Sequence, residues 1–134
     1  MLQRTCTIIK SSTKFKRHIC IDIDSYEEIA QLIFKDKNYE AKFEYIAGRI
    51  LEQNFMYYDD YKKIENTPDG KITEMRFFPN GDNSRIYCKE VTINGDTFCI
   101  IMAKVLLKKK SQKIDKKIRP LIDTLKTYRY DLEK

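Results

Sequence analysis

The sequence predicts one α+β domain in which an antiparallel β-sheet packs against two amino-terminal helices and one carboxy-terminal helix. Short β-branched and apolar runs bounded by turn residues predict the strands. Apolar residues that recur at helical spacing, between those runs and after them, predict the helices. Because 134 residues suffice for one domain with its own core, we expect residues 1–134 to form a single unit.

The amino-terminal part, residues 1–37, is expected to begin with a strand or hairpin. Residues 4–9 and 17–23 are β-branched and apolar, and they flank a polar turn at residues 10–16. Ser25 is then a suitable N-cap for a short helix, since Glu27 and Glu28 follow in its first turn. The apolar face of that helix would contain Ile29, Ala30, Ile33 and Phe34.

A second helix is predicted more strongly by one continuous apolar stripe. Its members are Tyr39, Phe43, Ile46, Ala47, Ile50 and Leu51. We expect Asn38 to cap the start of this helix, which should end near Asn54. The aromatic run that follows, from Phe55 to Tyr61, is interpreted as core packing combined with a hydrophobic linker.

From Lys71 onward the pattern is that of a three-stranded antiparallel meander. The predicted strands are residues 71–78, 84–92 and 97–107, separated by a turn at residues 79–82 and by the hairpin turn of Asn94 and Gly95. A last helix follows, with a kink or restart expected at Pro120. Its apolar face would contain Ile114, Ile118, Leu121, Ile122, Leu125 and Tyr128.

Composition excludes several classes of protein. No stretch approaches the roughly 20 apolar residues of a membrane helix, and no signal peptide is evident, so a cytoplasmic location is expected. The four cysteines, Cys6, Cys20, Cys88 and Cys99, form no C-x-x-C pair, so we expect reduced core thiols and no metal site. His18 is the single histidine, and no cofactor motif is present.

Charge is distributed unevenly along the chain. Residues 1–19 carry five basic and no acidic residues, and residues 20–74 carry seven basic and thirteen acidic residues. Residues 104–134 carry eleven basic and four acidic residues. Such a split predicts one face suited to a polyanion, although a solvated lysine face would give the same composition.

The strongest candidate site lies on the meander. Arg85 and Tyr87 are two residues apart on one predicted strand and should share a face, and the neighbouring strand could place Arg76 beside them. Arginine binds phosphate through its planar fork, and tyrosine can stack on a base or supply a hydroxyl group. The alternative is that these are ordinary strand residues with exposed tips. The candidate RNA-backbone contacts beyond them are Lys104, Lys108, Lys109, Lys110 and Lys113.

Residues 71–130 resemble the RelE/ParE toxin superfamily, and most closely its phage-derived, HigB-like branch. That branch typically has an ELR strand, a yRvfy strand, a short Gly-containing turn, an apolar strand and a KKtqktP segment before a final helix. The corresponding segments here read ITEMR, SRIYC, INGD, CIIMAKVLL and KKKSQKID. The helix predicted from Tyr39 onward occupies the place of the family's second helix.

This resemblance implies a RelE-like fold and the toxin of a type II toxin–antitoxin pair. Toxins similar to RelE inhibit translation by cutting mRNA on the ribosome, through attack of a ribose 2′-hydroxyl on the adjacent phosphate. The resemblance assigns Arg76 and Arg85 to charge stabilisation and Tyr87 to the same site. It assigns Tyr128 or Tyr130 to acid–base chemistry or base stacking, because no histidine lies in this region. The implied partners are mRNA and an antitoxin, often a helix-turn-helix protein.

Two other functions stay open on the sequence. A ParE-like protein would inhibit DNA gyrase by protein contact and would not cut RNA. A catalytically inactive relative would keep the scaffold and only bind RNA or an antitoxin.

Overall fold

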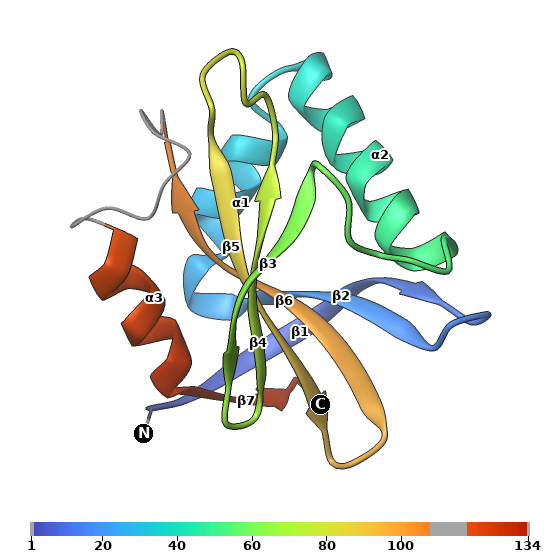
Figure 1. The fold of residues 1–134 in the computed structure, drawn as a ribbon, viewed down its shortest axis with the longest axis vertical. Helices are drawn as coiled ribbons and strands as arrows, with labels where there is room; N and C mark the ends of the chain where they lie inside the picture. Colours follow the sequence, from blue (N-terminus) through green and yellow to red (C-terminus); the bar gives the residue numbers. More distant parts are fainter. Residues whose placement is uncertain (1, 108–117, 134) are drawn as a thin grey trace.

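The computed structural model, which describes residues 2–107 and 118–133, shows an α+β protein with three α-helices and a seven-stranded mixed sheet (Figure 1). In chain order the elements are β1 (Leu2–Ser12), β2 (Arg17–Asp22), the 3-10 helix η1 (Ile23–Ser25), α1 (Tyr26–Ile33), α2 (Lys37–Glu52), β3 (Tyr61–Thr67), β4 (Gly70–Arg76), β5 (Arg85–Ile93), β6 (Thr97–Leu106), α3 (Ile118–Thr127) and β7 (Tyr128–Leu132).

The strands are ordered β3-β4-β5-β6-β2-β1-β7 across the sheet. The predicted meander and amino-terminal hairpin are confirmed, and the hairpin joins the meander through β2 and β6. The β2–β6 and β1–β7 pairs are parallel, so the prediction of a purely antiparallel sheet is wrong. The long connections through helices allow these parallel pairs, because a parallel pair requires a crossover rather than a hairpin.

β3 was not predicted: the aromatic run of residues 55–61 was interpreted as core packing with a linker, and no element was assigned to residues 62–70. β3 lies at the sheet edge, where most of its side chains reach water, so it lacks an apolar alternation. Its buried residue is Tyr61, at its start. Gly70 begins the returning strand, and a Cβ atom there would lie 1.8 Å from the Glu90 carbonyl oxygen. Glycine is therefore required for β4 to approach β5 at this point.

The six-residue stripe of α2 is buried as predicted. The helix begins one residue before the expected cap, because the Asp36 carboxylate accepts the Tyr39 amide at 2.9 Å. Ser25 does occupy the N-cap position of α1, but its side chain makes no capping hydrogen bond. Phe34 lies just beyond the helix and is 64% exposed, so its place on the predicted buried face is wrong. Leu32 is buried on that face instead.

The carboxy-terminal segment differs from the predicted long helix. α3 is described over Ile118–Thr127 and contains Pro120. Ile114 lies outside the described residues. Tyr128 begins β7 rather than extending the helix, and β7 pairs in parallel with residues 2–6 of β1. This pairing completes the sheet with a strand that local sequence pattern did not predict.

The sheet separates two hydrophobic cores. α1 and α2 cover one face together with alternate residues of the central strands, among them Ile86, Cys88 and Met102. α3 covers the opposite face, where it packs on Tyr87, Ile101 and their neighbours (Figure 1). All four cysteines are buried and free. No helix within residues 2–107 and 118–133 is long and apolar enough to cross a membrane.

Candidate nucleic-acid interface

The strand register brings four of the candidate residues onto the α3 side of the sheet. Arg76 of β4 lies opposite Arg85 of β5, and Tyr87 of β5 lies opposite Lys104 of β6. Since opposite residues in a ladder share a face, the four side chains form one group, which we call the strand-arginine cluster. The expectation that Arg76 lies beside Arg85 and Tyr87 is confirmed.

Arg85 is enclosed by protein groups within this cluster. Its Nη1 donates to a carboxylate oxygen of Glu74 at 2.8 Å, and its Nε and Nη2 donate to the side-chain oxygen of Asn83 at 3.0 and 2.7 Å. The side chain is fully buried, and this burial lowers the pKa of Arg85 from its ordinary value, while Glu74 opposes the shift. The guanidinium is therefore bound inside the fold and does not present an exposed tip.

Tyr87 is also fully buried, among the residues on which α3 packs. Neighbours on the same strand face, together with α3, cover its ring. A ring in this position cannot stack on a base without movement of the surrounding side chains. In this structure Tyr87 is therefore a buried member of the cluster and does not contribute to its accessible surface.

Arg76 and Lys104 form the accessible part of the cluster, because each is only half-buried. Arg76 donates from Nη1 to the Asp59 carbonyl oxygen at 3.2 Å, and its backbone amide donates to the Asp60 carbonyl oxygen at 2.8 Å. Lys104 has no ion-pair partner among the residues that the structure describes. The expected contacts Lys108, Lys109, Lys110 and Lys113 lie outside those residues.

Tyr128 and Tyr130 belong to β7, the last strand in the sheet order. This strand approaches the middle and the carboxy-terminal end of β5, where Lys89 donates to the Tyr128 carbonyl oxygen at 2.6 Å and Val91 lies beside Tyr130. Both are buried, and the hydroxyl of Tyr130 donates to Asp22 at 2.7 Å. Burial is the larger cause, and this hydrogen bond the next, of a raised pKa for Tyr130. The guanidinium of Arg4 lies 4.2 Å from the centre of the Tyr128 ring and donates to Asp22 at 2.6 Å. Residues 128–132 form a strand that pairs with β1, and the two tyrosines lie toward the middle and the end of β5, whereas Arg85 begins that strand opposite Arg76.

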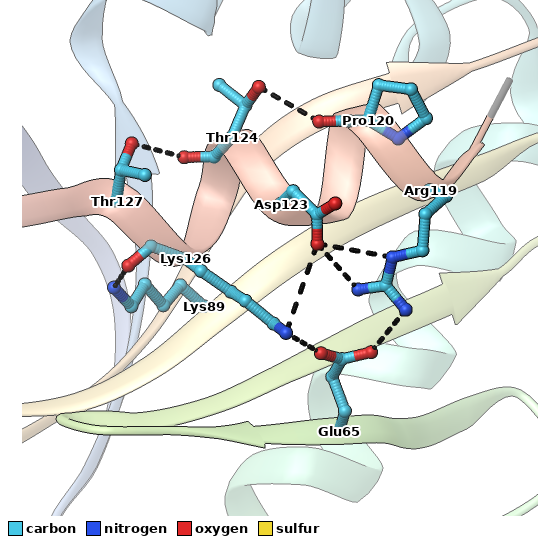
Figure 2. Close-up of polar contacts among 8 residues, drawn as sticks. All are labelled: Glu65, Lys89, Arg119, Pro120, Asp123, Thr124, Lys126 and Thr127. Carbon is cyan, nitrogen blue, oxygen red and sulfur yellow. Dashed lines mark hydrogen bonds and ion pairs between the residues drawn. The ribbon is translucent and has the colours of Figure 1, made fainter.

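A group of ion pairs between α3 and β3 was not predicted from the sequence. Glu65 of β3 accepts from Arg119 at 2.9 Å and also pairs with Lys126, while Arg119 pairs with Asp123 within the helix (Figure 2). Hydrogen bonds from Arg119 and Lys126 lower the pKa of Glu65. The turn signal at Pro68-Asp69-Gly70 could have placed Glu65 on a strand beside β4, but its position opposite α3 depends on the packing of the helix.

Lys89 is a second missed residue. Its amine is fully buried and donates to the carbonyl oxygens of Lys126 at 3.2 Å and Tyr128 at 2.6 Å, where α3 ends and β7 begins. It also forms an ion pair with Asp69 at 3.1 Å. Burial lowers the pKa of Lys89, and the hydrogen bond to Asp69 opposes that shift. A lysine at an inward position of a buried strand was the available signal for an internal partner.

Comparison with protein families, with curated proteins and with solved structures finds no match. Within residues 2–107 and 118–133, no group of histidine, cysteine, aspartate and glutamate side chains could hold a metal ion. The fold and the strand-arginine cluster thus define an α+β protein with a basic patch at one end of its central strands.

Proposed function

We propose that this chain is a translation-inhibiting toxin similar to the RelE/ParE superfamily, and that its strand-arginine cluster binds mRNA. The observation that carries the proposal is the pairing of Arg76 with Arg85 beside Tyr87 and Lys104. The element order gives partial support, because the main helix, the meander and the final helix are parts that the RelE-like resemblance implies, whereas the amino-terminal hairpin, β3 and β7 are additional to it.

The burial of the cluster assigns different roles to its members. Arg76 and Lys104 are accessible, and we assign them to contacts with RNA phosphates. Arg85 is a positioning residue that fixes Glu74 and Asn83 beside Arg76. In a cleavage reaction, attack of the ribose 2′-hydroxyl places negative charge on the phosphate, and the guanidinium of Arg76 would stabilise that charge.

A second candidate is a relative that binds RNA or an antitoxin without cutting. The burial of Tyr87, Tyr128 and Tyr130 favours it, because no tyrosine assigned to acid–base chemistry reaches the surface of the cluster. A gyrase inhibitor of the ParE type is the remaining alternative. In either toxin function the expected partner is an antitoxin, and for the ribonuclease the substrate is mRNA on the ribosome.

Induced expression tests the proposal. We expect translation to stop, new mRNA ends to appear in primer extension, and both effects to be lost in Arg76→Ala and Lys104→Ala. Lys37→Ala is the matched control, since Lys37 is an exposed lysine on α2, which covers the opposite face.

The other results separate the alternatives. RNA binding without new ends would select the non-cleaving relative, and induction of the DNA-damage response without RNA ends would select the gyrase inhibitor. Full toxicity in both cluster variants would contradict the site.

A further inference from the structure

β1 is longer than the strand that pairs with its outer side. β1 extends from Leu2 to Ser12, but its ladder with β7 ends at Cys6, where only the Glu133 amide adds one more hydrogen bond, to the Cys6 carbonyl oxygen. On the side away from β2, no other described strand pairs with residues 7–12. This segment is therefore an open sheet edge with backbone groups available to another strand.

An apolar groove lies beside this open edge. It has a volume of about 250 Å³ and is formed by β1, β2, α1 and α2. Ile9, Tyr26 and Phe34 line it and are 40%, 53% and 64% exposed. Ile21, Ile33 and Phe43 form its buried wall, and the ion pair of Lys10 with Glu44 at 3.0 Å lies on its border.

Exposed apolar side chains of the chain gather around this edge. Of the eight large hydrophobic residues exposed among the described residues, Ile8, Ile9, Ile23, Tyr26 and Phe34 belong to β1, η1 and α1 or follow α1 directly. Such clustering marks an interaction surface more than scattered exposure does. A strand added to β1 would direct alternate side chains toward the groove, because side chains alternate between the two faces of a sheet.

The charge around the edge specifies the kind of strand. Of the five basic residues among residues 1–19, Arg4 and Lys10 form ion pairs with Asp22 and Glu44, and Arg17 donates to backbone carbonyl oxygens at the end of α2. The exposed side chains of Lys14 and Lys16, in the hairpin loop that ends β1, form no ion pair with another described residue. In an antiparallel pair formed by two copies of residues 7–12, the hairpin loops would lie at opposite ends, and residues 1–19 of each copy would offer no acidic residue to the Lys14 and Lys16 of the other. An acidic strand would complement these two lysines.

We propose that residues 7–12 of β1 and the adjoining groove bind an extended acidic segment of another protein by strand addition. The segment adds to the sheet beside β1, next to the end of β7. Its apolar side chains enter the groove, and its acidic side chains lie near Lys14 and Lys16. This surface is separate from the strand-arginine cluster, so the inference does not rest on the RNA-directed function.

Binding of a defined peptide tests this inference. The probe is a fluorescein-labelled eight-residue peptide of alternating leucine and glutamate, and the control peptide has lysine in place of glutamate. We expect the acidic peptide to bind in fluorescence anisotropy and to slow amide hydrogen exchange at residues 7–12. Phe34→Glu should weaken binding by at least about tenfold, or about 1.4 kcal/mol. Lys14→Glu should also weaken it.

Phe55→Glu is the matched control, because Phe55 is 84% exposed but does not line the groove, so the peptide should bind this variant as it binds the parent. Two results would overturn the proposal: no binding of the acidic peptide, or equal binding of the lysine peptide. Sedimentation velocity should show a monomer. A dimer that Phe34→Glu disrupts, but Phe55→Glu does not, would assign the edge to a second copy and overturn the choice of partner.

Discussion

Glu74 and Arg85 form a buried ion pair that joins β4 to β5, with 2.8 Å between the carboxylate oxygen and Nη1. Their side chains are 10% and 1% exposed. The two residues belong to the ITEMR and SRIYC segments that carry the family resemblance. In this structure the two segments therefore contribute the buried ion pair that links β4 to β5, and ITEMR also contributes the half-buried side chain of Arg76.

The first prediction concerns stability. Arg85→Met should lower the free energy of unfolding by about 3 kcal/mol, because it keeps most of the side-chain volume but leaves Glu74 buried without its cation. Urea unfolding followed by circular dichroism measures this. In the double variant with Glu74→Gln the loss should be smaller than the sum of the single losses. Additive losses would contradict a direct coupling between the two residues.

The second prediction concerns RNA affinity. The logarithm of the affinity for single-stranded RNA falls linearly with the logarithm of the salt concentration. Arg76→Ala should reduce the magnitude of that slope by about 1, because the variant loses one phosphate contact and so releases fewer counterions on binding. A salt titration by anisotropy measures the slope. Lys37→Ala should leave it unchanged, and an unchanged slope in Arg76→Ala would remove this residue from the interface.

The third prediction separates the two groups of tyrosines. Tyr130→Phe should lower stability by about 1 kcal/mol, because Asp22 loses one hydrogen bond but keeps those from Arg4. The variant should retain the toxicity and RNA affinity of the parent, because Tyr130 is buried and lies beside Val91 and Ile93, at the other end of β5 from Arg85. Thermal unfolding and the induction assay measure the two effects. Loss of toxicity in a folded Tyr130→Phe protein would return this hydroxyl to the functional site.

The fourth prediction is a pH dependence of the attachment of α3. The pKa of Glu65 is lowered in the fold from its ordinary value of 4.5 by Arg119 and Lys126. Its contribution to stability is therefore fully present above that value and is lost as the pH falls through the lower, folded-state pKa. For a partly exposed cluster we expect this contribution to be below about 1 kcal/mol.

Amide hydrogen exchange in α3 measures this attachment. After correction for the intrinsic pH dependence of exchange, the amides of α3 in the parent should exchange faster in acid than at neutral pH. In Glu65→Gln the same amides should exchange faster than in the parent already at neutral pH. Asp123→Asn is the control within the same network, because Asp123 lies on α3 itself and does not join the helix to β3. Equal protection of α3 in the parent and in Glu65→Gln would contradict the role of Glu65.

Local pattern was sufficient for several parts of this protein. The buried stripe of α2, the hairpin turn at Asn94 and Gly95, and the shared face of Arg85 and Tyr87 all follow from the periods of helices and strands. Those periods operate over a few residues, so they can be read without knowledge of the rest of the chain. The same holds for the capping of α2, which was misplaced only from Asp36 to Asn38.

Tertiary pairing decided the remainder. β7 is a strand because the edge of β1 accepts it. β3 pairs with β4 across Pro68-Asp69-Gly70, a local turn signal from which the hairpin was not predicted, and its own residues lack an apolar alternation. The pairing of β7 placed Tyr130 beside Val91 and Ile93, at the other end of β5 from Arg85, although the sequence alone allowed it to share a site with Arg76. It also ended at Cys6, which left residues 7–12 open.

The sequence by itself determined the α+β class, the main helix, the meander and the position of Arg76 beside Arg85. Only the tertiary structure decided which of these charged and aromatic side chains reach water. Exposure depends on what packs over a residue, and α3, Glu74 and Asn83 cover Tyr87 and Arg85 from separate parts of the fold. The burial of a side chain thus depends on contacts with residues that are distant in the sequence. The face of the sheet that a strand residue occupies depends only on its own position in the strand.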